Sequence, residues 1–393
     1  MAEVALPQAA RPPFWRNVRV LRVLGQVVFV LVLIEVFREI GLNLAYGLRQ
    51  IGLDLSFGFL DSRAGFGIKE GIEYSPNHSY LKAYAVGVVN TIRVAGIGIV
   101  LATLLGLVMG VARLSPNWLV RKVAQVYVEA IRNTPVLIQV IFLWLAVILT
   151  LPVIEGGLSL GNVAFLSNRG GAIPWIHAGN GLGAWAAFLA LGLAAAAGVW
   201  VWRTRVNERT GDPHHRVLWS GGLFLLVAAT GYVVARDPLR LDVPTAGRRG
   251  YEGGLQLSPE YAAILLALVI YTGAFIAEIV RGSILAVSKG QKEAAAALGF
   301  RPGQQLRFIV LPQAMRVAIP PLNSQFLNLT KNSSLAIAIG YPDLMAISRT
   351  IMNQAGRATQ MLVIVMLTYL SMSLFISLLM NLLNRIVTRS ELR

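Results

Sequence analysis

Long stretches without a charged residue constrain the fold of this chain more than any other feature. Six runs contain no Asp, Glu, Lys or Arg: Val94–Ala112, Asn133–Ile154, Leu182–Trp202, Val217–Ala235, Tyr261–Ala277 and Ala358–Asn384. Another run, Val317–Pro342, contains one charge, Lys331. A membrane-spanning helix needs roughly 20 mostly apolar residues, and these runs reach or approach that length. They predict a chain that crosses a membrane repeatedly.

A shorter uncharged run near the N-terminus, Val23–Ile34, admits two interpretations. The arginines that precede it resemble the start of a secretory signal peptide: Arg11, Arg16, Arg19 and Arg22. However, Phe37, Arg38 and Glu39 follow in place of a small-x-small cleavage site, which favours a retained helix. The predicted fold is therefore an all-α integral membrane protein, a polytopic bundle of about eight transmembrane helices.

Composition and charge agree with this fold. Only 14% of the 393 residues are charged, against about 25% in a soluble domain. With a cytoplasmic N-terminus, the inside segments hold 21 Lys and Arg in 101 residues, and the outside segments hold 12 in 110 residues. Positive residues concentrate in cytoplasmic loops, so both termini are expected in the cytoplasm. Four arginines oppose this bias: Arg236, Arg240, Arg248 and Arg249.

One polar segment between predicted spans, residues 293–314, has a regular pattern: EAAAALGFRPGQQLRFIVLPQA. Ser288 and Gln291 have the spacing of a capping box, which starts a helix. Gly299 can take the left-handed conformation that ends a helix, and Pro302 follows as a stop. We expect a short helix, a turn and an amphipathic return to the membrane. An interfacial helix lying on lipid fits the same pattern.

The spacing within this segment resembles the cytoplasmic signature loop of permease subunits in bacterial ATP-binding-cassette (ABC) importers. That pattern is Glu-Ala-Ala, three residues, Gly, nine residues and Ile-x-Leu-Pro, and all of it is in register in this chain. The matching residues are Glu293, Ala294, Ala295, Gly299, Ile309, Leu311 and Pro312. The resemblance implies that the short helix enters a cleft of an ATPase subunit and transmits its closure.

Further stretches resemble the polar-amino-acid branch of these importers, at residues 90–110, 129–145, 271–299 and 331–340. The similarity covers roughly residues 82–153 and 259–385, and implies transport of glutamate, glutamine, aspartate and asparagine or of L-amino acids generally. The chain departs from the five-span core of that branch by one N-terminal span and two inserted spans. The expected divisions are an N-terminal segment with the extra helix (1–81), the first half of the permease core (82–153), an insertion with an extracytoplasmic loop and helix pair (154–258), and the second half of the core (259–393), which contains the coupling loop 281–316.

The chain lacks the residues for its own ATP hydrolysis. Gly-Lys occurs nowhere in it, which excludes a Walker A motif, so the resemblance implies that ATP and Mg bind to a partner. No cofactor and no metal is expected in this chain. The implied partners are two ATPase subunits, a second homologous permease subunit (a different chain being favoured over a second copy), an extracytoplasmic amino-acid-binding protein and the lipid bilayer. Nucleic-acid binding is not expected, because the basic residues are dispersed over short loops.

Polar groups within predicted spans are candidates for the substrate path, because burying them in lipid is costly. Lys331 shares a helical face with Asn328 and Asn332, and Ser333 adjoins them. The Pro320-Pro321 pair can break this helix, and broken helices commonly build transport sites. Alternatively, Lys331 marks a helix end and extends to the interface.

A second candidate segment contains Glu129, Arg132, Thr134 and Pro135. The resemblance favours a contribution to the path or its gate, whereas a helix entry with an N-terminal Pro is the structural alternative. Glu278 and Arg281 are expected to stabilise a helix end or to pair with the 129–132 segment. Arg93 is expected to extend to the interface.

The combined interpretation is a permease subunit of an ABC importer that moves L-amino acids across the bacterial inner membrane by alternating access. A secondary transporter driven by an ion gradient is the first alternative, and it would typically show inverted repeats. A membrane enzyme is the second, and it would need a catalytic cluster.

Overall fold

The computed structural model of the chain describes residues 18–50, 56–154, 157–161, 163–210, 215–247 and 250–389. Within these ranges, six helices are long and apolar enough to cross a membrane, and two bent helix pairs raise the number to eight if each pair is one span. The predicted helical membrane bundle is confirmed. Both chain ends, which are predicted to be cytoplasmic, lie outside the described residues. The same is true of four of the arginines named above: Arg11, Arg16, Arg248 and Arg249.

The helices in chain order are α1 (Val18–Gln50), α2 (Tyr80–Ala112), α3 (Trp118–Arg132), α4 (Val136–Phe142), α5 (Leu182–Thr210), α6 (Arg216–Val234), α7 (Pro259–Leu285), α8 (Lys289–Ala297), α9 (Pro302–Gln305), α10 (Leu311–Asn332), α11 (Leu344–Ala355) and α12 (Ala358–Arg389). Short 3-10 segments are η2 (Gly58–Asp61) and η6 (Ser333–Ile339), and π-helical turns are η3 (Leu143–Ile148) and η5 (Leu306–Val310).

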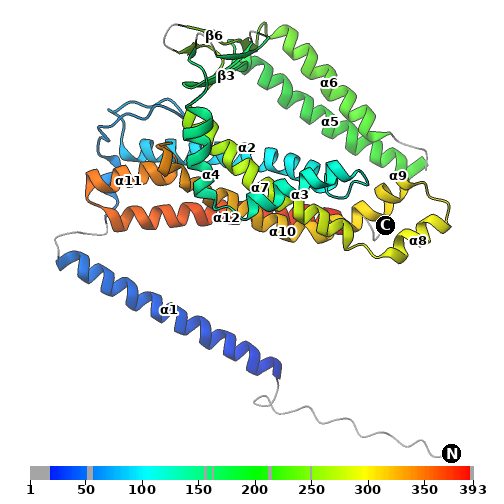
Figure 1. Cartoon of the computed structure of the whole chain (residues 1–393), viewed down its shortest axis with the longest axis horizontal. Coiled ribbons are helices and arrows are strands. Elements are labelled where there is room, and N and C mark those ends of the chain that lie inside the picture. The colour runs from blue at the N-terminus through cyan, green and yellow to red at the C-terminus, as the bar shows by residue number, and fades with distance from the viewer. Residues whose placement is uncertain are drawn as a thin grey trace, which may run out of the picture.

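The centre of the bundle is the crossing of α2 and α7, the most extensive helix pair in the fold. Glycines allow this approach: a Cβ atom at Gly106 would lie 2.5 Å from Ile276 Cγ2, and one at Gly110 would lie 2.8 Å from the Ala277 carbonyl oxygen. Small residues at helix interfaces let backbones approach closely in membranes. Figure 1 shows α2, α7, α10 and α12 running together, with α11 at one end and α8 and α9 at the other.

Two predicted spans are bent pairs of helices. The run Asn133–Ile154 is helical only from Val136 to Ile148, and it meets α3 at 103°. The other bend, of 56°, separates the helical segment containing α10 from α11. The predicted break at Pro320-Pro321 is wrong, because α10 continues through both prolines, whose fixed φ is close to helical. The helix instead ends in η6, and Gly340 follows with φ +78°.

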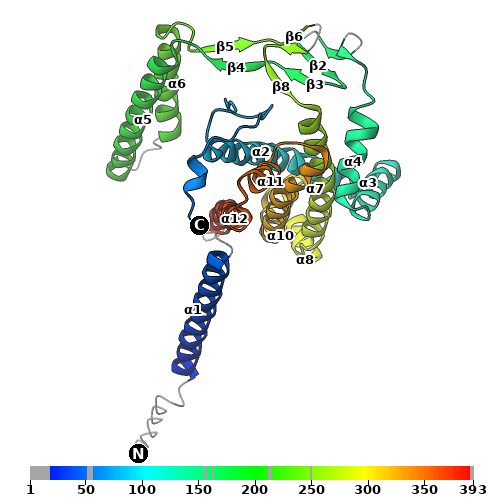
Figure 2. The same ribbon diagram turned by 90° about the vertical axis from the view of Figure 1, so that its left-hand side faces the viewer.

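The insertion is a β stem that carries a helical hairpin. Its strands are β1 (Leu158–Leu160), β2 (Ala164–Ser167), β3 (Gly170–Ile173), β4 (Trp175–Ala178), β5 (Leu239–Asp242), β6 (Thr245–Ala246), β7 (Tyr251–Glu252) and β8 (Leu255–Leu257). All pairs are antiparallel, in sheets ordered β1-β2-β3-β8, β4-β5 and β6-β7. The turn-rich segment 155–181 thus contains four strands, of which β3 and β4 pair with strands from beyond the hairpin. Figure 2 shows this stem joining the α5–α6 hairpin to the bundle.

The three helices outside the predicted core bury little of their surface. In the most apolar window of each, the buried share is 0% for α1, 6% for α5 and 11% for α6, close to the 6% of core helix α12 and far below the 50% of α7. Figures 1 and 2 show α1 apart from the bundle. These helices therefore depend on lipid or on other chains to cover their apolar side chains.

Candidate functional site

The predicted coupling loop contains the short helix that its sequence indicates. α8 is followed by Gly299, whose φ is +80°. The Gly299 N–H donates to the Ala296 carbonyl at 2.9 Å, and the Phe300 N–H donates to the Ala295 carbonyl at 3.1 Å. This pair of hydrogen bonds is a Schellman motif, which ends a helix by using a left-handed residue. The predicted left-handed conformation of Gly299 at the end of this helix is confirmed.

Two details of the loop differ from expectation. Ser288 is the N-cap of α8, but its side chain makes no capping hydrogen bond. Gln291, the other half of the predicted capping box, has its side-chain oxygen directed to the Gln313 amide at 3.5 Å. Pro302 does more than end the preceding helix, because it begins α9, where its missing N–H has no cost.

The loop presents apolar side chains on an otherwise polar surface. Leu298 is 78% exposed, Phe308 is 55% exposed and Leu306 is 52% exposed. Of the signature residues, Ala295 is buried, Ile309 and Pro312 are half-buried, and Glu293, Ala294, Gly299 and Leu311 are exposed. Buried Val287, Val310 and Ala314 attach the loop to the bundle. The arrangement is a short anchored helix with an uncovered apolar surface.

The path candidates around Lys331 occupy the end of α10, just before the bend. Asn328 and Lys331 are exposed and Asn332 is half-buried, as the predicted shared face requires. Ser333 is buried, and its hydroxyl donates to the Thr330 carbonyl at 2.7 Å. The structure therefore places Ser333 inside the bundle rather than on the exposed face.

The second candidate segment forms the sharp turn between α3 and α4. Glu129 accepts a hydrogen bond from Gln125 at 2.7 Å, and the Arg132 guanidinium lies 5.1 Å from the Phe275 ring centroid. The Thr134 hydroxyl donates to the Ala130 carbonyl at 2.7 Å. Pro135 caps α4.

Buried Gln139 holds this turn, since its amide donates to the Ile131 and Thr134 carbonyls at 2.9 and 3.0 Å. α4 contacts η6, so this segment meets the other candidate segment beyond Lys331. Glu278 pairs with Arg281 on its own helix and with Arg113 at the end of α2. Glu278 and Arg281 thus pair with each other near the end of α7, and neither forms an ion pair with the 129–132 segment among the described residues.

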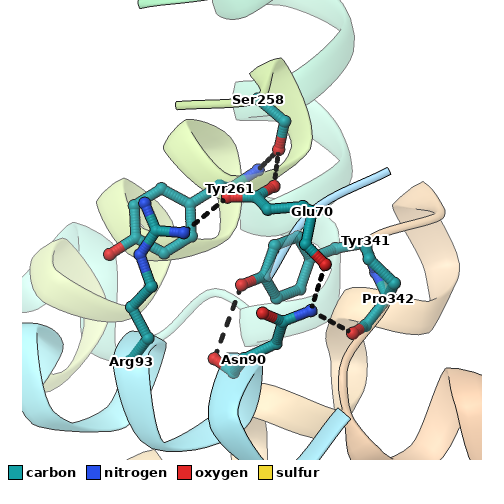
Figure 3. Close-up of polar contacts among 7 residues, drawn as sticks. All are labelled: Glu70, Asn90, Arg93, Ser258, Tyr261, Tyr341 and Pro342. Carbon is teal, nitrogen blue, oxygen red and sulfur yellow. Dashed lines mark hydrogen bonds and ion pairs between the residues drawn. The ribbon is translucent and has the colours of Figure 1, made fainter. Parts of the chain in front are cut away.

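A buried polar cluster at the opposite end of the bundle does not follow from the sequence pattern. The outer polar cluster consists of Glu70, Asn90, Arg93, Ser258, Tyr261, Tyr341 and Pro342 (Figure 3). Arg93 Nη1 lies 3.1 Å from Glu70 Oε1, and its guanidinium is 4.5 Å from the Tyr261 ring centroid. The Ser258 hydroxyl, at the N-cap of α7, donates to the other Glu70 oxygen. Arg93 thus has a fixed partner and does not extend to the interface as expected.

Asn90 connects the same cluster to the bend that follows α10. Its amide donates to the Glu70 carbonyl at 3.1 Å and to the Pro342 carbonyl at 2.8 Å. The Tyr341 hydroxyl donates in return to the Asn90 carbonyl at 3.4 Å. Burial raises the pKa of Glu70 above its ordinary value, although the Ser258 hydrogen bond and the positive charge of Arg93 oppose this. Four segments that are distant in sequence are therefore joined at one point.

A cavity of about 710 Å³ lies beside the cluster, between it and the β stem. Its charged lining consists of Lys69, Glu70, Arg169 and Glu260. Glu70 and Ser258 belong to both the cavity wall and the cluster. One feature of the sequence could have pointed to this site, the single charge of Arg93 beside an uncharged run, but nothing in the pattern identified its partner in residues 62–79.

Comparisons with known proteins identify several relatives. A family model described as binding-protein-dependent transport system inner membrane component matches residues 253–391. The general L-amino acid transport system permease protein AapQ of Rhizobium johnstonii is 42% identical, over 91% of this chain and 89% of its own length. The glutamate/glutamine/aspartate/asparagine transport system permease protein BztB of Rhodobacter capsulatus is 39% identical, over 89% and 90%. A solved amino acid ABC transporter with histidines is 20% identical with TM-score 0.47, covering 78% of this chain and 94% of the other.

Proposed function

This chain belongs to the family of binding-protein-dependent transport system inner membrane components, and we propose that it forms half of the path of an ATP-driven amino-acid importer. One observation carries the proposal: the Glu-Ala-Ala part of the in-register signature lies on a short, mostly exposed helix that ends at left-handed Gly299. Such a helix fits a groove on a partner. Leu298 and Phe308 supply apolar surface for that contact.

Two helices connect the coupling loop to the outer polar cluster. α7 begins beside Ser258 and ends before α8, and α10 starts after η5 and leads to η6, Tyr341 and Pro342. A displacement of α8 would therefore move α7 and α10, whose other ends lie beside Glu70 and Asn90. We infer that closure of the ATPase subunits moves these helices and changes the side to which the path opens, which is alternating access.

The substrate path is proposed to include the exposed end of α10. An amino acid carries an α-carboxylate, which needs a cation or several hydrogen-bond donors within an apolar path. Lys331 supplies a cation there, and Asn328 supplies an amide on the same face. The turn at Glu129–Pro135 is the second proposed contributor, because η6 and α4 are in contact. Ser333 would act by holding the end of α10 rather than by facing substrate.

The remaining elements of the proposal follow from the family and from the named relatives. Two ATPase subunits would bind ATP and Mg, and an extracytoplasmic binding protein would deliver the substrate. A second, homologous permease subunit would complete the path, with a different chain favoured over a second copy. The names of the relatives support L-amino acids, including the acidic and amide ones, as substrates. The coupling loop and both termini would face the cytoplasm, with 82–153 and 259–393 as the transport core.

Uptake of labelled glutamate and glutamine tests the proposal. Cells that express this chain together with the proposed ATPase subunits, second permease subunit and binding protein should accumulate both amino acids. Cells that lack only this chain should not. ATP depletion should abolish uptake, whereas an ionophore applied with ATP maintained should leave it nearly intact. The reverse pattern would favour an ion-gradient-driven transporter.

A further inference from the structure

Arginine and tryptophan side chains gather at the end of the α5–α6 hairpin that lies away from the β stem. The arginine–tryptophan cluster consists of Trp200, Trp202, Arg203, Arg216 and Trp219. The Arg203 guanidinium of α5 lies 4.8 Å from the Trp219 ring centroid of α6, and the Arg216 guanidinium of α6 lies 4.8 Å from the Trp200 ring centroid of α5. Each arginine thus lies over a tryptophan of the other helix. Trp202 is also 5.2 Å from the Arg203 guanidinium.

The two stacked guanidinium groups retain unused hydrogen-bonding capacity. Among the described residues, neither Arg203 nor Arg216 forms an ion pair with an acidic side chain. The Arg203 Nε atom is buried and has no hydrogen-bond partner in that same set of residues. Residues 203–216 contain four arginines against two acidic residues, Glu208 and Asp212. A cation over an aromatic ring is held in place, but its charge remains available to an anion.

The surroundings of the arginine–tryptophan cluster indicate which kind of anion could reach it. α5 and α6 are both long and apolar enough to span a membrane and are almost unburied, so in a membrane lipid lies against whatever part of their surface no other chain covers. Trp200, Trp202 and Trp219 are all exposed, and tryptophan is enriched at the level of lipid headgroups. Figure 1 shows the last turns of α5 and the first turns of α6 at the same end of the molecule as α8 and α9. This is the cytoplasmic side in the proposed orientation.

We propose that the arginine–tryptophan cluster binds the phosphate headgroup of an anionic phospholipid. Guanidinium groups suit phosphate because they donate two parallel hydrogen bonds, and basic residues near a membrane surface attract anionic lipids. The exposed tryptophan rings would contact the glycerol and the upper acyl chains. A lipid bound at both arginines would join α5 to α6 and fix the depth of a hairpin that the core does not hold. The proposal does not depend on which substrate is transported.

Reconstitution of the full chain, with the subunits that purify with it, tests this proposal. Nanodiscs of phosphatidylglycerol and of phosphatidylcholine should differ: phosphatidylglycerol should raise the unfolding temperature and remain bound in native mass spectrometry. We expect the Arg203→Gln/Arg216→Gln variant to lose about tenfold in preference for phosphatidylglycerol, since both stacked charges are removed. The matched control is Arg205→Gln/Arg209→Gln, which removes the same charge from two exposed arginines on α5. It should keep most of the preference.

Four outcomes would overturn the proposal. The first is an equal fall in unfolding temperature in both lipids for the Arg203→Gln/Arg216→Gln variant, because the arginines would then only hold the helices together. The second is an equal loss of preference in the control, which would indicate diffuse charge. The third is stabilisation by inorganic phosphate in phosphatidylcholine nanodiscs, which would indicate a free anion. If the glutamine variant fails to fold, the single variants Arg203→Gln and Arg216→Gln replace it, and an unchanged preference in both is the fourth.

Discussion

The two ends of the helix bundle differ in how far the chain itself covers them. At the coupling-loop end, α8 is mostly exposed, and Leu298 and Phe308 have no apolar cover. At the other end, the outer polar cluster is enclosed, and Glu70, Asn90 and Arg93 bond to one another or to adjoining helices. The coupling-loop end therefore has apolar surface that a partner could cover, whereas the end with the outer polar cluster is closed by the chain's own residues. Because α7 and α10 run between them, we propose that partner binding at the first end opens the second.

The largest expected effect is at Gly299. In Gly299→Val, a β-branched residue is forced to φ +80°, a conformation that costs roughly 1–2 kcal/mol or more, so the loop should be misplaced. We expect amino-acid uptake to fall at least about tenfold and the ATPase to co-purify poorly, with membrane insertion intact.

Gly303→Val is the matched control for this change. A Cβ atom at either glycine would meet no neighbouring atom, but only Gly299 has a positive φ. Uptake in Gly303→Val should stay close to wild type. Equal losses in the two variants would show that bulk, not backbone conformation, matters, and normal uptake in Gly299→Val would remove the coupling role.

The closed end is tested by Glu70→Ala. It removes the carboxyl group that accepts from both Arg93 and Ser258, and leaving a buried donor without its acceptor costs about 1–3 kcal/mol. The unfolding temperature should fall clearly, while ATPase co-purification persists. Glu73→Ala, an exposed acid in the same segment, should change neither. Wild-type stability in Glu70→Ala would mean that the cluster does not close this end.

A smaller change is expected from Lys331→Met, which keeps the side-chain length and removes the charge. A charged hydrogen bond to the substrate carboxylate is worth roughly 1.5–3 kcal/mol, so the half-saturating amino-acid concentration should rise about tenfold or more. Lys122→Met, which removes the charge of an exposed lysine on α3, is the control. Unchanged kinetics at matched expression would transfer the proposed contact to the Glu129–Pro135 turn.

The smallest effect is a pH dependence of stability. Because the folded-state pKa of Glu70 is raised from its ordinary value of 4.5, the folded chain binds this proton more readily than the unfolded chain. The stabilisation that protonated Glu70 gives the folded chain is therefore complete below the ordinary pKa of 4.5, and it is lost as the pH rises through the raised pKa. Unfolding curves from pH 4.5 upward should show the wild type losing stability relative to Glu70→Gln. Parallel curves would show that Glu70 does not titrate in this way.

The two ends also differ in how far sequence alone predicts them. Gly299, α8 and the family follow from local spacing, because a helix and its C-terminal glycine are determined by neighbouring residues. The Pro320-Pro321 pair predicts a bend within α10, yet η6 and Gly340 form it, since helix packing tolerates the prolines. Glu70 could not be paired with Arg93, because 23 positions separate them and no periodic pattern links a loop to a span. Two strand pairs of the insertion, β3–β8 and β4–β5, join residues on either side of the whole α5–α6 hairpin, which no local pattern reveals.

Single cysteines in this Cys-free chain test the central claim most directly, namely that the partner-binding end and the closed end lie on opposite sides of the membrane. Asn77→Cys lies in the exposed region of the segment that carries Glu70, and Gln291→Cys lies on exposed α8. With an impermeant thiol reagent, we expect Asn77→Cys to be labelled in cells whose outer membrane alone is opened. Gln291→Cys should be labelled only after the inner membrane is permeabilised. Labelling of Gln291→Cys while the inner membrane is sealed would contradict the account, because no cytoplasmic ATPase could then reach the loop.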